Sequence, residues 1–440
     1  MKLLNDIMNT IYAENVWRIG MNLKKITSFI LGVTMITSLC SCSKDPSQSQ
    51  NSSLGSGEII ETNHDLDSFD LEKYLAPVWS GNVSYAESAF VRQNEQGKVE
   101  PIQLLYDIDE IISVRSFDLK TQYIEGVDYR VTNKKLEIIE GGSIPVLEYS
   151  KHHIPVYVND GLKTQIPASD NSGSAYILSE TTKTNPGMSA WSIAVTYKHS
   201  SKSVVTIPTD NSSTYIDFLL KLKNGENVKA VFYGDSITYG WAVSKTEEVS
   251  REPYCPSYPN LVMDYIENKF GVVVERANHS RSGETTNWAK EYVNYMKVVD
   301  ENPDIVILAF GMNDAGGMDS ETFISNIKGI MRNITTKCKE KWDKDVPFVV
   351  VGTMLPNDKV GFNPGSCLLN YHNEYAEVLE TLTYNKATFA FANVTQVHNQ
   401  MLTRKVFQDT TSSNSNHPND YMHRVYAQVV LRTILGNQYN

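Results

Sequence analysis

The chain has 440 residues, of which 41% are hydrophobic and 21% are charged, an ordinary composition for a globular protein. A chain of this length is expected to contain two or three domains. The formal net charge of −11 argues against a nucleic-acid partner, because phosphate backbones are bound by an excess of Lys and Arg. Most other classes of function remain open on composition and charge alone.

Residues 26–39 form the one strongly apolar segment near the start of the chain. Two lysines directly precede the segment, and small residues follow it at 40–42. This order predicts a secretory signal, whereas the segment is too short and too polar for a membrane span. Since residues 1–20 carry no such pattern, Met21 is the expected true start.

The residues that end this segment resemble a bacterial lipobox, with Leu39 three positions before Cys42. The resemblance implies that 1–42 is a signal region and that Cys42 becomes the lipidated first residue of the mature protein. The chain would then be secreted and anchored to the membrane of the bacterial cell envelope, on the periplasmic or the cell-surface side. An ordinary cleaved signal or an uncleaved anchor are the alternatives. Residues 43–70, rich in Ser, Gln, Asn and Gly, predict a flexible tether.

Short runs of β-branched and aromatic residues alternate with turn residues across 71–210, which predicts an all-β, sandwich-like or jelly-roll-like domain. The runs lie at 82–85, 103–106, 111–114, 129–131, 136–139 and 193–197. The aromatic residues Trp79, Tyr85, Tyr106 and Trp191 either form a platform for sugar rings or, as is more common, pack in the core. A helical pattern over 211–225, which ends at Asn224-Gly225, predicts a connecting helix.

The apolar run 228–233 is followed directly by Gly234-Asp235-Ser236. The pattern predicts a buried strand that ends in a sharp turn, with Ser236 at the carboxyl end, where open α/β sheets bind ligands. A serine there acts as a nucleophile if a base reaches it and hydrogen-bond donors stabilise the oxyanion. Taken by itself, Ser236 could equally cap the next helix.

Three later segments could complete such a site. Gly283 lies in a loop that follows the apolar run 272–274, where a glycine allows close approach of the backbone to a ligand. Asn313 follows the nearly continuous apolar run 304–310 and could donate to an oxyanion through its amide. His417 stands just before a segment of helical periodicity that ends at Gly436.

These four segments, in this order, resemble the SGNH or GDSL-type hydrolases over 226–440. The resemblance implies an α/β fold, a three-layer α/β/α domain with a parallel sheet, and ester hydrolysis through an acyl-enzyme. It implies Ser236 as the nucleophile and His417 as the general base. The backbone N–H groups of Ser236 and Gly283 and the amide of Asn313 would form the oxyanion hole. No metal and no organic cofactor are expected.

One position departs from the family pattern, because Asn414 stands where the family usually has the Asp three residues before the His. An amide cannot stabilise an imidazolium with negative charge. A Ser-His dyad is therefore one expectation, with His417 oriented by Asn414 or by a local backbone carbonyl. Asp420 or Asp409 could supply the carboxylate instead, although Asp420 also suits the first turn of a helix.

Five cysteines occur, at 40, 42, 255, 338 and 367, and their number and spacing predict neither a disulfide framework nor a metal site. A single bridge among the last three remains open.

A β domain ahead of an SGNH domain resembles the build of bacterial carbohydrate esterases. The resemblance implies a deacetylase that removes short acyl groups, chiefly O-acetyl, from a polysaccharide or oligosaccharide. A lipid esterase or lysophospholipase is the second hypothesis. A glycan-binding lipoprotein with a degenerate hydrolase domain is the third.

Overall fold

The computed structural model describes residues 70–159, 165–178, 182, 185–246, 249–361 and 371–439. The predicted signal region, the lipidation site Cys42, nearly all of the predicted tether and Cys367 lie outside these residues. All described residues belong to one structural unit, Thr62–Asn440. None of the helices described in it is both long enough and apolar enough to cross a membrane.

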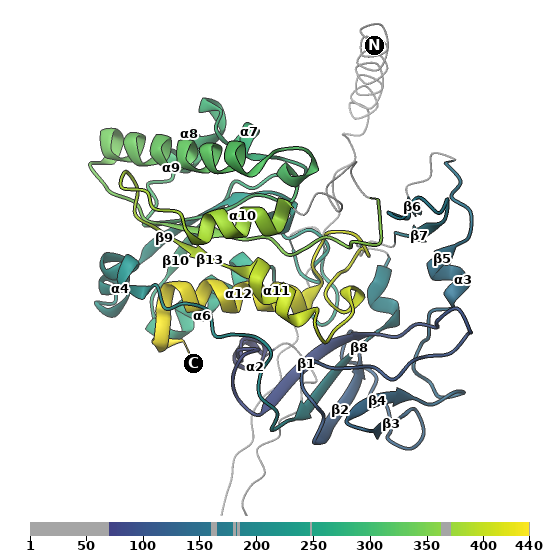
Figure 1. Ribbon diagram of the computed structural model, residues 1–440. Helices are drawn as coiled ribbons and strands as arrows, with labels where there is room; N and C mark the ends of the chain where they lie inside the picture. Colours follow the sequence, from purple (N-terminus) through teal and green to yellow (C-terminus); the bar gives the residue numbers. More distant parts are fainter. Residues whose placement is uncertain are drawn as a thin grey trace, which may run out of the picture. The chain divides into compact units, whose positions relative to one another are not determined.

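The first part of the described chain contains antiparallel strands, as expected for a β domain. The largest sheet has the order β1-β8-β2 and consists of β1 (Val83–Phe90), β8 (Ser192–Lys198) and β2 (Glu110–Ser116). A hairpin pairs β3 (Tyr129–Thr132) with β4 (Lys135–Ile138), and a small sheet joins β5 (His153–Ile154), β7 (Ala175–Ile177) and β6 (Gln165–Pro167). Two one-turn helices, α2 (Leu71–Tyr74) and α3 (Tyr149–His152), accompany these strands (Figure 1).

One predicted strand, 103–106, is wrong, because this segment forms a loop. Its backbone donors bind side chains instead of a neighbouring strand. The N–H of Leu105 donates to Glu87 Oε1 at 2.8 Å, and the N–H of Tyr106 donates to the hydroxyl of Tyr197 at 3.0 Å. A hydrophobic run can therefore be buried with its backbone satisfied and still lie outside any sheet.

The proposed aromatic platform for sugars does not exist as a surface. Trp79 and Tyr106 are buried, and the Tyr106 hydroxyl donates to the carbonyl of Val78 at 2.7 Å. Trp191 packs against a small buried cluster, and Tyr85 packs against the main core. The alternative interpretation, core packing, is confirmed.

The second part of the described chain is built on a five-stranded parallel sheet with the order β10-β9-β11-β12-β13. Its strands are β9 (Val228–Gly234), β10 (Val274–Asn278), β11 (Ile305–Ala309), β12 (Phe348–Val351) and β13 (Phe389–Ala392). The helices are α4 (Ile216–Lys223), α5 (Ser236–Tyr239), α6 (Tyr258–Phe270), α7 (Thr286–Ala289), α8 (Tyr292–Asp300), α9 (Ser320–Trp342), α10 (Tyr371–Glu380), α11 (Val394–Met401) and α12 (Asp420–Leu435). The α4 helix lies where the connecting helix is predicted.

Alternate residues along each strand face opposite helical layers, which explains why the strands are apolar throughout. Phe232 and Ile307 belong to the core that contains α6 and α12, whereas Val231 and Leu308 belong to the core that contains α8, α9 and α10. Figure 1 shows these two groups of helices on either side of the sheet. The predicted three-layer α/β/α arrangement is confirmed.

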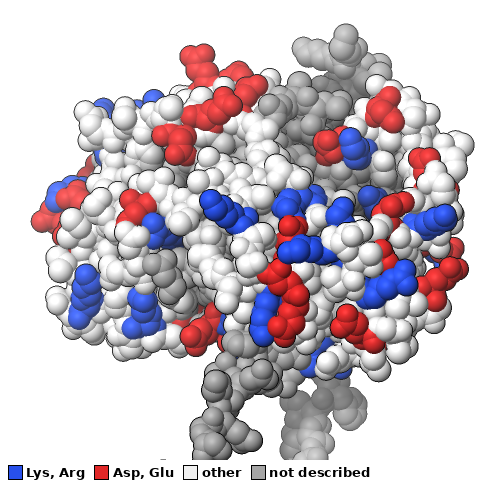
Figure 2. Space-filling view, turned by 60° about the horizontal axis from the view of Figure 1, so that its bottom comes forward, with Lys and Arg blue, Asp and Glu red and all other residues white. Residues whose placement is uncertain are grey.

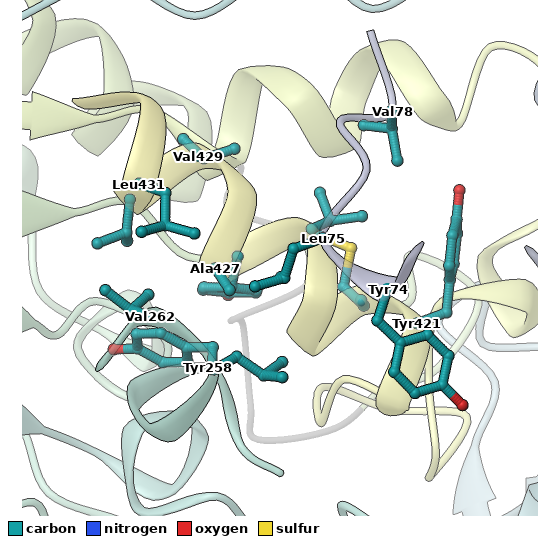
Figure 3. Close-up of a cluster of buried hydrophobic side chains, with 14 of the residues drawn as sticks. Tyr74, Leu75, Val78, Tyr258, Val262, Tyr421, Ala427, Val429 and Leu431 are labelled. Carbon is teal, nitrogen blue, oxygen red and sulfur yellow. The ribbon is translucent and has the colours of Figure 1, made fainter. Parts of the chain in front are cut away.

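Helix α12 is also a major contact of the β domain. The guanidinium of Arg424 donates to the backbone carbonyls of Tyr74, Tyr85 and Ala86 at 2.6–3.0 Å. Apolar side chains of α2, α6 and α12 form one buried cluster beside this contact (Figure 3). The helix that follows His417 is thus held by both parts of the chain.

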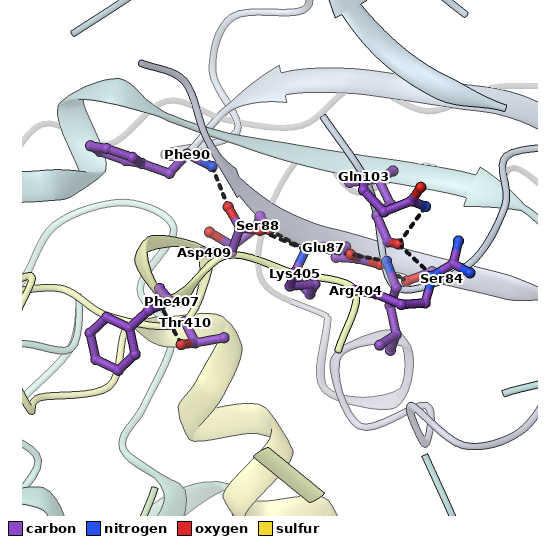
Figure 4. A network of polar contacts seen from close by, with 12 residues as sticks. Ser84, Glu87, Ser88, Phe90, Gln103, Arg404, Lys405, Phe407, Asp409 and Thr410 are labelled. Carbon is purple, nitrogen blue, oxygen red and sulfur yellow. Dashed lines mark hydrogen bonds and ion pairs between the residues drawn. The ribbon is translucent and has the colours of Figure 1, made fainter. Parts of the chain in front are cut away.

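A buried ionic network makes a second connection between the two parts (Figure 4). Lys405 Nζ lies 2.5 Å from Glu87 Oε1 and 3.4 Å from Asp409 Oδ2, and all three side chains are almost fully buried. The N–H of Phe90 donates to Asp409 at 2.7 Å. Burial alone would lower the pKa of Lys405, but the two carboxylates raise that pKa above its ordinary value, so Lys405 stays a cation.

Candidate active site

Ser236 lies at the turn between β9 and α5. A side chain at Gly234 would overlap the carbonyl oxygen of Ala309, so the last residue of β9 must be a glycine. Asp235 caps α5 by accepting from the N–H of Ile237 at 2.9 Å. Ser236 is therefore the first residue of the helix and sits at the carboxyl end of a strand with neighbours on both sides.

The strand order brings the loop that contains Gly283 next to this turn. Strand β10 pairs directly with β9, and the N–H of Arg281 in the following loop donates to the carbonyl of Gly234 at 3.0 Å. Gly283 has a φ of +79°, which favours glycine, and a side chain there would meet open space. Its backbone is thus exposed in a loop fixed to the end of β9.

Asn313 follows β11, the other neighbour of β9. Its Nδ2 donates to the carbonyl of Glu284 at 2.9 Å, which ties the Asn313 amide to the residue next to Gly283. This bond uses one of the two N–H groups of the amide. Strand pairing and this hydrogen bond together gather Ser236, Gly283 and Asn313 at one end of the sheet.

Two buried carboxyl groups support these loops, and the sequence interpretation gave them no role. Asp314 accepts from the N–H of Thr286 at 2.8 Å and from its hydroxyl at 2.5 Å, which joins the β11 loop to α7. Burial raises the pKa of Asp235 to about 7, and the nearby Asp314 adds to this shift. The signal in the sequence was that both follow strand ends, each beside a predicted site residue.

His417 completes the arrangement, because its Nε2 lies 3.0 Å from Ser236 Oγ. The backbone of His417 is held on both sides: its N–H donates to Ser413 Oγ at 3.3 Å, and its carbonyl accepts from Ser412 N at 3.0 Å and Thr411 Oγ1 at 2.8 Å. Helix α12 begins three residues later and stops at Gly436, as expected. The loop thus fixes the imidazole at hydrogen-bond distance from the serine.

An aromatic ring lies beside this pair. The ring centroids of Trp241 and His417 are 6.2 Å apart, and the backbone N–H of Trp241 donates to the carbonyl of Ser236 at 3.0 Å. Trp241 is 37% exposed. Trp241 is absent from the site predicted from the sequence, although its position soon after the serine turn was a usable signal.

The three candidates for orienting His417 make their contacts elsewhere. Asn414 Oδ1 accepts from Asn357 Nδ2 and Gln408 Nε2, both at 2.9 Å, and its Nδ2 lies 3.5 Å from His152 Nε2 and from the carbonyl of Ile177. These bonds make Asn414 a buried anchor of the loop.

The two aspartates are likewise engaged away from the imidazole. Asp420 Oδ1 accepts from the N–H of Ser244 at 2.9 Å, and burial raises the pKa of Asp420 to about 6. Asp409 belongs to the buried network with Lys405. None of the contacts described for these two residues or for Asn414 reaches the imidazole of His417.

Cys255 and Cys338 are buried free thiols, so they do not pair with each other. Among the described residues, His, Cys, Asp and Glu side chains form no group of three that could hold a metal ion.

Part of this chain is similar to known proteins. No protein of curated function matches the chain. The solved structures that resemble it include a two-domain esterase active on acetylated mannans, with 20% identity, 53% of this chain and 56% of that esterase covered, and a TM-score of 0.37. This chain thus spans little more than half the length of that esterase.

Two other similar structures are matched over nearly their whole length. An acetylxylan esterase from Geobacillus stearothermophilus has 17% identity, 48% and 96% coverage of this chain and of that chain, and a TM-score of 0.36. The lipase/acylhydrolase from Enterococcus faecalis has 20% identity, the same coverages and the same TM-score. Likenesses this distant identify no substrate. Residues 232–425, however, match the family model described as the GDSL-like Lipase/Acylhydrolase family, and this part of the chain is a domain of that family.

Proposed function

We propose that the protein is a serine esterase in which Ser236 is the nucleophile and His417 the general base. The observation that carries this proposal is the 3.0 Å separation of Ser236 Oγ and His417 Nε2 at the carboxyl end of β9. His417 takes the hydroxyl proton as Oγ forms a bond to the ester carbonyl carbon. The carbonyl oxygen becomes an oxyanion, which accepts from the N–H groups of Ser236 and Gly283 and from the amide of Asn313.

The tetrahedral intermediate then collapses and the bond to the alcohol oxygen breaks. The proton on His417 passes to the leaving alcohol, and the acyl group stays on Ser236 as an ester. Water next gives a proton to His417 and attacks the acyl carbon. The same donors stabilise the second oxyanion, and the carboxylic acid leaves as the proton returns to Ser236. Atoms and protons balance over the cycle without any further group.

The substrate that we propose is a short acyl ester, chiefly O-acetyl, on a carbohydrate. The solved structures named above are too distant to identify it, so the proposal rests on the site. Trp241 presents a partly exposed indole beside His417, and an aromatic face packs well against the apolar face of a sugar ring. A sugar stacked there would place an O-acyl group near Ser236.

The test is release of acetate from acetylated xylan and acetylated mannan by the purified protein, with Ser236→Ala as the control for adventitious hydrolysis. The same preparations are assayed on p-nitrophenyl esters of increasing acyl length and on a lysophospholipid. We expect acetate release by the wild type, and activity that falls as the acyl chain lengthens. Preference for long chains or for the lysophospholipid would assign the enzyme to lipid ester hydrolysis instead.

We also propose that the enzyme is held at the bacterial cell envelope by a lipid on Cys42. The support is the sequence pattern of a basic start, an apolar segment and Leu39 three residues before Cys42. A tether between this anchor and the folded part would let the site reach a polymer above the membrane surface.

A further inference from the structure

A second concave site lies away from the catalytic pair, where the β domain meets the segment 404–409. It has a volume of about 540 Å³, within the range of small-molecule sites. Its wall combines aromatic rings with polar side chains, among them Phe90, Arg92, Tyr149, His152, Tyr176 and Arg404. Neither Ser236 nor His417 belongs to this lining, so the reaction described above leaves the cavity unexplained.

The protonation of His152 shows what a ligand must supply. This side chain is 1% exposed, and burial lowers its pKa to about 3, so the imidazole is neutral. Its Nε2 lies 3.5 Å from the amide nitrogen of Asn414 and 3.5 Å from a guanidinium nitrogen of Arg92. Both of these groups are donors, so Nε2 must accept and Nδ1 must carry the proton.

That Nδ1–H has no acceptor among the described residues. A buried N–H donor without a partner costs free energy, so a ligand oxygen that accepts from it would stabilise the complex. Arg92 offers further donors, because this partly exposed side chain has the single 3.5 Å contact to His152 as its described hydrogen bond. A guanidinium offers five N–H donors, so most of its capacity is unused.

The charges around the cavity favour a neutral ligand. Arg404 is already paired with Asp107 at 2.5 Å, and Asp409 is paired with Lys405. The lining also contains Glu95 and Glu100, whose negative charges an anionic ligand would meet. Basic and acidic side chains lie interspersed on the face drawn in Figure 2, without a broad area of one sign.

The two tyrosines provide the apolar part of the surface. Tyr149 and Tyr176 are half-buried, and the ring of His153 lies 5.2 Å from each of them. Tyr176 also makes an edge contact with His152, at 5.4 Å between centroids. Aromatic faces beside hydrogen-bond donors suit a molecule that carries both C–H faces and hydroxyl oxygens.

We propose that this cavity is an accessory binding site for a neutral oligosaccharide, with a sugar hydroxyl accepting from His152 Nδ1–H and a sugar ring packed on Tyr149 or Tyr176. The choice of a sugar chain rests on the proposed function, whereas the demand for a neutral, oxygen-rich ligand does not. Such a site would hold the polymer while Ser236 acts on another of its residues. One lining residue, His152, also lies 3.5 Å from the amide nitrogen of Asn414, three residues before His417 in the sequence.

The test measures binding of unacetylated xylohexaose and mannohexaose to the full mature protein by calorimetry, with an oligogalacturonate as the anionic comparison. Neither probe contains an ester, so binding is independent of hydrolysis. The variants are Tyr149→Ala, which removes a ring, and His152→Phe, which keeps a ring but removes Nδ1–H. Tyr292→Ala is the matched control, because Tyr292 is a 60% exposed tyrosine on α8 that does not line the cavity.

We expect one of the two hexaoses to bind the wild type and the Tyr292 control equally, and to bind Tyr149→Ala and His152→Phe at least tenfold more weakly. Hydrolysis of p-nitrophenyl acetate by Tyr149→Ala should stay within twofold of wild type. Absence of binding to the wild type, or equal binding by Tyr149→Ala and the control, overturns the site even if the esterase is active. Tighter binding of an oligogalacturonate overturns the neutral-ligand assignment. Absence of ester hydrolysis by the wild-type protein would instead refute the proposed function.

Discussion

Replacement of Asn414 by alanine should damage stability far more than catalysis. The change deprives Gln408 Nε2 of its described partner, which costs about 1–3 kcal/mol for a buried donor. Asn357 Nδ2 keeps the backbone carbonyl of residue 414 at 3.0 Å, so loss of its second bond costs about 0.5–1.5 kcal/mol. Asn414 has a φ of +59°, and alanine in that region adds about 1 kcal/mol. We expect the free energy of unfolding to fall by about 3–5 kcal/mol.

The turnover of folded Asn414→Ala should fall about tenfold or less, since the side chain does not contact the imidazole of His417. Urea denaturation measures stability, and hydrolysis of p-nitrophenyl acetate at fixed pH measures kcat. Asn414→Gly is the matched variant, because glycine accepts the positive φ and should recover about 1 kcal/mol. A folded alanine variant that loses about 10⁴-fold in kcat would show that Asn414 orients His417. A stability loss below 1 kcal/mol would refute the buried-anchor assignment.

Four further outcomes are expected. Asn313→Ala should lower kcat by roughly 10²–10³-fold with a smaller change in KM, because the amide meets charge that develops in the transition state; a rise in KM alone would contradict this role. Lys405→Met should lower the free energy of unfolding by about 3–5 kcal/mol in a urea titration, because it leaves two carboxylates buried without a cation; an unchanged midpoint would refute it. The raised pKa of Asp420, about 6 against an ordinary 3.8, means that the folded state binds the proton more tightly than the unfolded state, so this group lowers stability as the pH rises through that interval. The free energy of unfolding of Asp420→Asn, relative to that of the wild type, should therefore be higher at about pH 8 than at about pH 4. An equal difference between variant and wild type at the two pH values would exclude the pKa shift. Mass spectrometry of the mature N-terminus should find lipid on Cys42, and a chain that begins elsewhere with a free Cys42 would exclude the anchor.

Short apolar runs predicted two strands of the parallel sheet because such strands are covered on both faces, and β9 and β11 begin within one residue of the expected runs. The run 272–274 was a poorer guide, because β10 shares only Val274 with it, and β12 and β13 were not predicted. The same argument failed at 103–106, where Leu105 and Tyr106 are buried although their backbone bonds end on side chains. Local hydrophobicity indicates burial there, but the hydrogen-bond partners of the backbone are the side chains of distant residues, Glu87 and Tyr197. A single sequence does not show that pairing.

The site divides in a similar way. Ser236, Gly283 and Asn313 each follow a strand, and parallel strands deliver their carboxyl ends to one edge, so their proximity could be inferred from order along the chain. The role of Asn414 could not be inferred, because its partners come from 57 residues away at Asn357 and from the β domain at His152. The sequence showed only that the usual carboxylate was missing at that position.

The most direct test of the esterase mechanism is hydrolysis of p-nitrophenyl acetate by Ser236→Ala, with folding verified by circular dichroism and by an unchanged urea midpoint. The mechanism requires Ser236 Oγ, which lies 3.0 Å from His417 Nε2, to form the acyl-enzyme bond. We predict that kcat falls by roughly 10⁴–10⁶-fold in the folded variant. Near wild-type turnover by folded Ser236→Ala would contradict the assignment of this serine as the nucleophile.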